Sequence, residues 1–121
     1  MQTIELNHIA IHVKNVAESV DFYKNTLEFE QIPRPAFDFD GAWFRLGSVQ
    51  ELHILEGRDY EVQSSSRKTH FALKVASINE SEQFLVKKKV TFRAPKQRPD
   101  GLYQIFVVDP DGYWIELCGQ L

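Results

Sequence analysis

Four side chains that bind transition metals stand at matched separations along the chain. His8 and His53 are 45 residues apart, and His70 and Glu116 are 46 residues apart. Three imidazoles and one carboxylate suit a borderline divalent ion such as Fe, Mn, Ni, Co or Zn, whereas Ca and Mg prefer oxygen ligands. Four protein ligands on an octahedral ion leave two positions for water or substrate. These residues therefore predict a divalent-metal site that can take up a small-molecule substrate.

In the strands expected around these residues, their side chains lie on the face of the sheet that points away from the helix. Side chains at i and i+2 of a strand share a face, so His8 points away from Ile9, which should meet a helix. The same argument applies to His70. Glu116 and His53 should likewise point away from their apolar neighbours, which are Leu52, Ile54, Ile115 and Leu117. A Glu116 buried among such neighbours would cost stability unless it is paired or metal-bound.

The second ligand of the first half has a rival. A histidine in a strand is more often a hydrogen-bonded or surface residue than a ligand, but three of the four histidines fall at repeat-related positions. Glu51 lies two residues from His53 on the same strand face. His53 is favoured because its spacing better matches the second half. His12 lies about 13 Å along the strand from His8, too far to share the ion.

The chain repeats itself after a shift of 62 residues. Residues 8–22 then lie over residues 70–84 with six identities in fifteen positions. Each copy has a good N-cap, Asn15 or Ser77, followed three positions later by glutamate in the capping-box pattern. The repeat predicts two copies of one structural module.

Each module reads as βαβββ. The first helix has an apolar stripe of Val16, Val20, Tyr23 and Leu27, and the second is expected over residues 78–89. Strand-like runs cover residues 6–13, 29–32, 42–46, 49–55, 70–75, 90–93, 103–108 and 113–118. Asp109-Pro-Asp-Gly112 is typical of a type I turn. We therefore expect an α+β fold of two tandem modules, residues 4–60 and 68–121, forming a curved, partly open mixed sheet around a central cleft.

Composition and charge exclude several classes of function. The chain has 43% hydrophobic and 26% charged residues and a net charge of -3, so no nucleic-acid partner is expected. No apolar run approaches the roughly 20 residues of a membrane span, and no signal peptide is predicted. A single cysteine, Cys118, excludes an intramolecular disulfide and suits a reducing compartment, so a cytoplasmic protein without a membrane partner is expected.

Several motifs together resemble one family. His8-Ile-Ala-Ile-His-Val, Phe22-Tyr23, His70-Phe-Ala and Asp109-Pro-Asp-Gly-Tyr-Trp-Ile-Glu116-Leu are similar to the vicinal oxygen chelate superfamily of glyoxalases, bleomycin-resistance proteins and extradiol dioxygenases. The resemblance covers nearly the whole chain and implies one such domain over residues 1–121. Family ligands lie on the first and last strands of each module, which matches His8, His53, His70 and Glu116. The resemblance also implies a homodimer, with the cleft formed within one chain or between two.

The resemblance leaves the reaction open. A glyoxalase-like lyase or isomerase would chelate adjacent substrate oxygens on the metal, stabilise an enediolate and use Glu116 as general base. A dioxygenase would use Glu116 only as a ligand, and a thiol transferase would activate an electrophile. Glyoxalase I lyases typically carry a carboxylate at the position of His53, and extradiol dioxygenases use two histidines and one glutamate. The alternatives outside catalysis are a metal-free, drug-binding protein of the bleomycin-resistance kind and a metal-bound regulatory binder.

Four further side chains are candidates for substrate binding. Trp114 is the best of them, since it shares a strand face with Glu116. Trp43 and Tyr103 are aromatic candidates for the pocket wall, although aromatic residues at strand spacing are more often core. Arg45 is a candidate receptor for a carboxylate or phosphate, with a surface ion pair as the alternative. Cys118 is expected to be structural because no base lies beside it.

Overall fold

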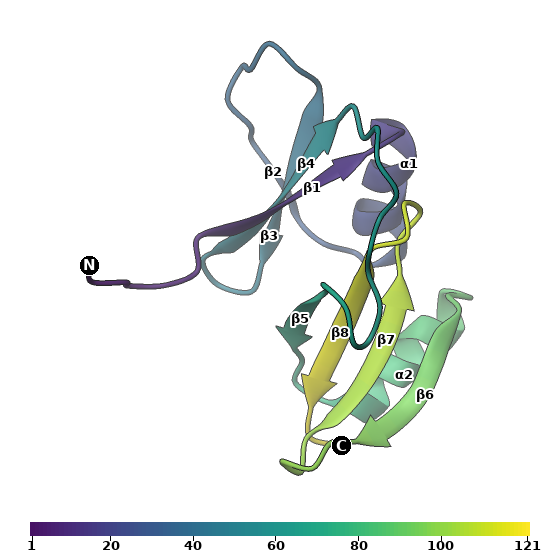
Figure 1. The fold of residues 1–121 in the computed structure, drawn as a ribbon. Helices are drawn as coiled ribbons and strands as arrows, with labels where there is room; N and C mark the ends of the chain where they lie inside the picture. Colours follow the sequence, from purple (N-terminus) through teal and green to yellow (C-terminus); the bar gives the residue numbers. More distant parts are fainter. The chain divides into compact units, whose positions relative to one another are not determined.

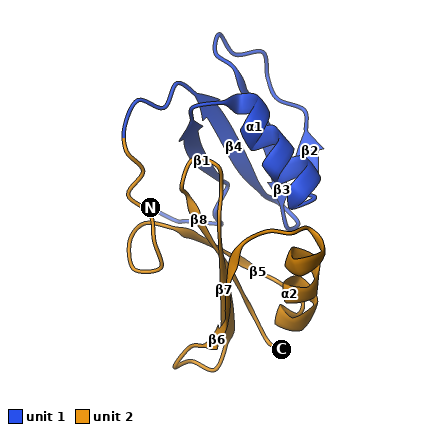
Figure 2. Ribbon diagram, turned by 90° about the vertical axis from the view of Figure 1, so that its right-hand side faces the viewer, with its two compact units in different colours: residues 1–60 blue, residues 61–121 orange.

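The computed structural model describes residues 1–121 and divides them into two compact units, residues 1–60 and 61–121 (Figure 1 and Figure 2). Each unit contains a four-stranded mixed sheet with a helix packed on one of its faces. The predicted α+β class is confirmed. No helix in the chain combines the length and the apolar character that crossing a membrane would need.

The first unit contains strands β1 to β4 and helix α1. Its sheet has the order β1-β4-β3-β2, with β1 parallel to β4 and the other neighbours antiparallel. The bounds of its elements are β1 His8–Val13, α1 Val16–Val20, β2 Gln31–Ile32, β3 Gly41–Leu46 and β4 Gln50–Glu56. A π-helical segment, Asp21–Thr26, continues α1.

The second unit repeats this topology. Its sheet has the order β5-β8-β7-β6, again with the first strand parallel to the last and antiparallel pairing elsewhere. The bounds are β5 Phe71–Lys74, α2 Ile78–Lys87, β6 Phe92–Gln97, β7 Tyr103–Val108 and β8 Trp114–Gly119. Two sheets with the same strand order are what a duplicated βαβββ module predicts.

Both helices begin where their capping residues predict. The side chain of Asn15 accepts a hydrogen bond from the backbone N of Glu18 at 3.0 Å, and Ser77 accepts one from Glu80 at 3.2 Å. The first helix differs from the prediction further along. The backbone N of Leu27 donates to the carbonyl of Phe22, five residues back, so the last turns are wider than α-helical ones.

The wider turns change the buried side of this helix. Tyr23 and Leu27 are buried as predicted, whereas Val16 and Val20 are only partly buried. Ser19 is fully buried in their place. The expected stripe is therefore right for the second half of the helix and only approximate for the first.

Strand β6 begins later than the expected run over residues 90–93. Residues 88–90 complete the C-terminal turn of α2: the N of Lys88 donates to the carbonyl of Phe84, and the N of Val90 to that of Leu85. The strand then runs through Pro95 to Gln97. Proline is tolerated there because β6 lies at the edge of its sheet.

The Asp109–Gly112 turn forms as predicted. The backbone N of Gly112 donates to the carbonyl of Asp109 at 3.1 Å, which is the bond between the first and fourth residues of a β-turn. The Asp109 carboxylate, which is buried, accepts from the backbone N of Asp111 and of Tyr113 at 2.9 Å. These bonds fix the start of β8, the strand that carries Glu116.

The apolar face of each sheet packs against its helix. In the first unit Leu52 and Ile54 of β4 are buried, and in the second Ile115 of β8 is fully buried. Alternation then turns the intervening side chains of these strands to the opposite face of each sheet. His53 of β4 and Glu116 of β8 are on that opposite face.

Truncating one of these core residues should destabilise the protein. Leu52→Ala leaves a cavity in a fully buried position and is expected to lower the free energy of unfolding by about 2–5 kcal/mol. Leu121→Ala is the matched control, because Leu121 is 52% exposed and should cost no more than about 0.5 kcal/mol. Urea unfolding followed by circular dichroism measures both values. Equal costs would contradict the assignment of Leu52 to the core.

Candidate functional site

Glu116 of β8 is a buried carboxylate with two charged or polar partners. Its relative exposure is 5%, and its ladder neighbours are Ala72 of β5 and Phe106 of β7. Oε2 lies 3.2 Å from Nε2 of His70, and Oε1 accepts a hydrogen bond from Nη1 of Arg98 at 2.9 Å. The ion pair with Arg98 thus offsets the burial cost expected for this carboxylate.

The hydrogen bonds of His70 determine which ring nitrogen carries a proton. Nδ1 lies 2.9 Å from the carbonyl oxygen of Lys68 and 3.0 Å from that of Ser65. Carbonyl oxygens only accept hydrogen bonds, so Nδ1 is the donor. In the neutral imidazole the lone pair of Nε2 then points at Glu116. Two acceptors at 3.2 Å need a cation between them, either a proton or a metal ion.

This arrangement fits a metal ligand. Metal-binding histidines usually donate their other ring N–H to a backbone carbonyl or a carboxylate, which fixes the tautomer and the ring orientation. Nδ1 of His70 makes such a bond to the carbonyl of Lys68. Within neither unit, however, do three or more His, Cys, Asp or Glu side chains gather into a metal-sized group. Each unit instead brings two candidate ligands together: His8 and His53 in the first, and His70 and Glu116 in the second.

Arg98 is a site residue that sequence reasoning missed. It lies in the loop between β6 and β7, where its Nη2 also pairs with Oδ2 of Asp100 at 2.5 Å. Asp100 and then Glu116 raise the pKa of Arg98, and Arg98 holds the pKa of Asp100 below its usual range. The arginine neutralises the buried charge of Glu116 and fixes its Oε1. A lone arginine in a loop, 18 residues from its partner, carries no periodic signal that would have indicated this role.

The first unit contains a column of three stacked rings. The rings of His8 and His53 lie 4.1 Å apart between centroids at 15°, and those of His53 and Trp43 lie 3.8 Å apart at 2°. His53 pairs directly opposite Trp43 in the ladder between β3 and β4, which explains the contact. The structure therefore brings together three residues that the sequence predicted for the site.

The strand register bears on the choice between His53 and Glu51. His53 lies opposite Ala10 of β1, and Glu116 lies opposite Ala72 of β5, the repeat-equivalent alanine. Glu51 lies opposite His8 instead. His53 and Glu116 thus hold equivalent ladder positions. Glu51 stays close, with Oε1 3.5 Å from Nε2 of His53, and remains a rival ligand.

The surroundings of His53 favour its neutral form. Burial of the ring is the largest cause that lowers its pKa, and the neighbouring His8 lowers it further, while Glu51 opposes both. A neutral imidazole is the form that binds metal ions. In the ring column, His53 is therefore held in the protonation state that a ligand needs.

The other residues predicted for substrate binding do not all lie on the face of Glu116. Trp114 lies beside Phe106, with ring centroids 5.6 Å apart, and carries the guanidinium of Arg93 over its ring. Tyr103 is on the other face of β7, with Ile105 and Val107, so the structure does not bring it to Glu116. Arg45 forms a surface ion pair with Glu30 at 3.2 Å, which is the alternative expected for it.

Comparison with known proteins identifies the family. The model of the Glyoxalase/Bleomycin resistance protein/Dioxygenase superfamily matches residues 5–117. The chain therefore belongs to this superfamily, which is the vicinal oxygen chelate family that its motifs predicted.

Individual relatives are similar at modest identity. A protein of Arabidopsis thaliana named Glyoxylase I 4 is 29% identical over 93% of this chain and 69% of the relative. Lactoylglutathione lyase of Schizosaccharomyces pombe is 29% identical over 99% of this chain and 49% of the relative, so the chain spans about half of that enzyme. Among solved structures, a glyoxalase family protein from Bacillus anthracis is 28% identical, with a TM-score of 0.82 and coverage of 99% of this chain and 97% of that one.

The protonation of His53 can be measured directly. NMR titration of the metal-free protein is expected to give a pKa for His53 below the ordinary value of about 6.5. His8→Gln should raise that pKa part of the way back, because burial, the larger cause, remains; His12→Gln is the control. As the pH falls, His53 is protonated in the unfolded chain at a higher pH than in the folded protein. Its contribution to stability is therefore fully present above about pH 6.5 and declines as the pH falls below that value. A pKa at or above the ordinary value would contradict this reading.

The pairing of Arg98 with Glu116 predicts a non-additive pair of substitutions. Arg98→Gln leaves a buried carboxylate oxygen without its charged partner and should lower the urea midpoint more than Asp100→Asn does. The double variant Arg98→Gln, Glu116→Gln should recover part of that loss, because the uncompensated charge is gone. Equal midpoints for Arg98→Gln and Asp100→Asn would mean that Arg98 serves only its surface partner.

Proposed function

We propose that the protein is a divalent-metal-dependent lyase or isomerase of the glyoxalase type, which moves a proton next to a carbonyl in a small oxygen-chelating substrate. Membership of the superfamily and the names of the two curated relatives support a glyoxalase-family enzyme. The observation that carries the proposal is the position of His70 Nε2, 3.2 Å from the buried carboxylate of Glu116, in a ring whose Nδ1 lies 2.9 Å from the carbonyl oxygen of Lys68.

The ion would be held by His8, His53, His70 and Glu116. One His8–His53 pair and one His70–Glu116 pair, from the same chain or from two chains of a homodimer, would share it. When bound, a divalent ion such as Fe, Mn, Ni, Co or Zn polarises substrate oxygens and stabilises the negative charge that develops on them. The homodimer and the small-molecule substrate stay predictions.

Residues of the chain would accept the proton, hold the His70 ring in position and contact the substrate. Arg98 occupies Oε1 of Glu116, so Oε2 is the oxygen available to accept a proton from a substrate carbon. The Ser65 and Lys68 carbonyls hold the His70 ring in place beside it. Trp43 and Trp114 are the aromatic side chains that would contact the substrate.

One observation favours a metal-free binding protein as the second candidate. Arg98 already neutralises Glu116 without any ion, so the buried carboxylate is stable in a metal-free protein. Such a protein would bind a small molecule without turnover, as in the drug-binding alternative. Stoichiometric metal in the purified protein would exclude this candidate.

Loss of a ligand should remove the metal and the activity together. His70→Ala and Glu116→Gln are each expected to lower metal affinity by at least about tenfold and to abolish turnover, because each removes a ligand without touching the apolar core. Metal content is measured by elemental analysis. Turnover is assayed with hemithioacetals, catechols, and epoxides with thiols, which separates lyase, dioxygenase and thiol-transferase activities.

His12→Ala is the matched control for these variants. His12 lies on the same strand as His8, is exposed, and is expected to leave metal content unchanged. Circular dichroism checks that every variant is folded. Full metal content in both folded variants, His70→Ala and Glu116→Gln, would refute the proposed metal site.

A further inference from the structure

A β-bulge in the second unit turns two cationic side chains to the same face. Arg93 of β6 pairs with Phe106 of β7, and Lys96 pairs with Gln104. β7 advances by two residues between these pairs while β6 advances by three, so β6 contains one extra residue. Without the bulge, Arg93 and Lys96 would point to opposite faces. With it, both lie on the face of Phe106, which is also the face of Glu116.

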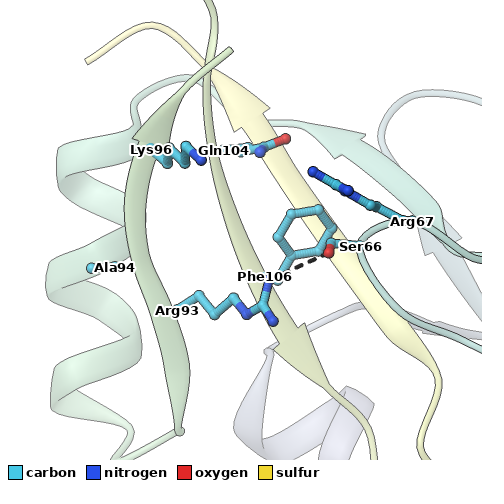
Figure 3. A pocket seen from close by; sticks show the side chains of 7 residues that line it. All are labelled: Ser66, Arg67, Arg93, Ala94, Lys96, Gln104 and Phe106. Carbon is cyan, nitrogen blue, oxygen red and sulfur yellow. Dashed lines mark hydrogen bonds between the residues drawn. The ribbon is translucent and has the colours of Figure 1, made fainter.

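These residues border a pocket of about 270 Å³ within the second unit (Figure 3). Arg93 and Lys96 contribute from β6, Gln104 and Phe106 from β7, and Arg67 from the segment before β5. The pocket is therefore lined by three cations and one amide, with the Phe106 ring between them in Figure 3.

The three cations have no counter-ion in the structure. No Asp or Glu lines the pocket, and none of Arg67, Arg93 and Lys96 forms an ion pair with a carboxylate. Arg45 and Arg98, by contrast, are both paired. Positive charges gathered in a hollow without compensation attract an anion.

Arg93 is also held in position. Its Nη1 donates to the hydroxyl of Ser66 at 3.3 Å, and its guanidinium lies over the Trp114 ring, 4.8 Å from the centroid. A guanidinium fixed in this way loses little freedom when it binds an oxyanion, because its donors are already oriented.

Phe106 connects the pocket to the candidate site. Its ring lies edge-on to His70, with centroids 5.5 Å apart, and its ladder partner is Glu116. Glu116 of β8, Phe106 of β7 and Arg93 of β6 are successive ladder neighbours, so the backbones of Glu116 and Arg93 are two strand spacings, roughly 10 Å, apart. A small molecule that spans about this distance can have one end beside Glu116 and a charged end beside Arg93.

We propose that this pocket binds an anionic group, a carboxylate or a phosphate, of the substrate. The identification of the bound molecule as substrate rests on the proposed function, whereas the anion site itself does not. The substrate class is then a small acid or phosphate ester whose charged end lies about two strand spacings, roughly 10 Å, from the end beside Glu116. The bulge contributes to the specificity for an anion because it turns Lys96 to the same face as Arg93, whereas regular alternation would turn it to the opposite face.

Anion binding can be tested on the full chain without metal. Metal-free protein is titrated with sodium phosphate or with sodium acetate at constant ionic strength, and the backbone amide shifts of Gln104 and Phe106 are followed by NMR. We expect saturable binding of at least one anion. Arg93→Gln and Lys96→Gln should each weaken it about tenfold, since each removes a charge-assisted contact. Tighter binding of phosphate indicates a phosphate ester, and tighter binding of acetate a carboxylic acid.

Lys87→Gln is the matched control. Lys87 is an exposed lysine at the end of α2, outside the pocket, so its loss changes net charge equally and should leave the affinity unchanged. No saturable binding of either anion, or equal affinity in the wild type, Arg93→Gln and Lys96→Gln, would overturn the proposal. Because the titration uses no metal, its failure is distinct from unchanged metal content in His70→Ala and Glu116→Gln, which would refute the metal site alone.

Discussion

A carboxylate in an apolar strand is the constraint on which the second unit depends. Glu116 is 5% exposed between Ile115 and Leu117, and an ionised group there is costly unless its charge is compensated. Arg98 provides that compensation at Oε1, while Oε2 faces Nε2 of His70. Because Arg98 fixes Oε1, the ion pair that stabilises the fold also orients the carboxylate proposed to move a proton.

In the first unit the corresponding position is occupied by a neutral ring and not by a charged group. His53 holds the ladder position equivalent to Glu116 but is stacked between Trp43 and His8. Burial and the neighbouring imidazole lower its pKa and keep it uncharged. The duplicated topology therefore carries two chemically different pairs, a neutral one and one centred on a negative charge. The proposed ligand set takes one pair from each unit, and its three nitrogen ligands would favour a transition metal over Ca or Mg.

The proposed anion pocket adds a second electrostatic feature on the face of Glu116. Glu116 is compensated by its arginine, so it does not cancel the three cations of Arg67, Arg93 and Lys96. A substrate with an anionic end would be attracted to those cations and directed away from the carboxylate. This separation of charges is a physical basis for orienting a small molecule before any proton moves.

The sequence alone was enough to predict the duplicated βαβββ order, both helix starts, the Asp109 turn and the faces of His8, His53 and Glu116. These features depend on neighbours within a few residues, through strand alternation, capping and turn chemistry. Arg98, the bulge of β6 and the stack on Trp43 came only from the tertiary structure. They depend on ladder register and on contacts between distant segments, which no local pattern indicates.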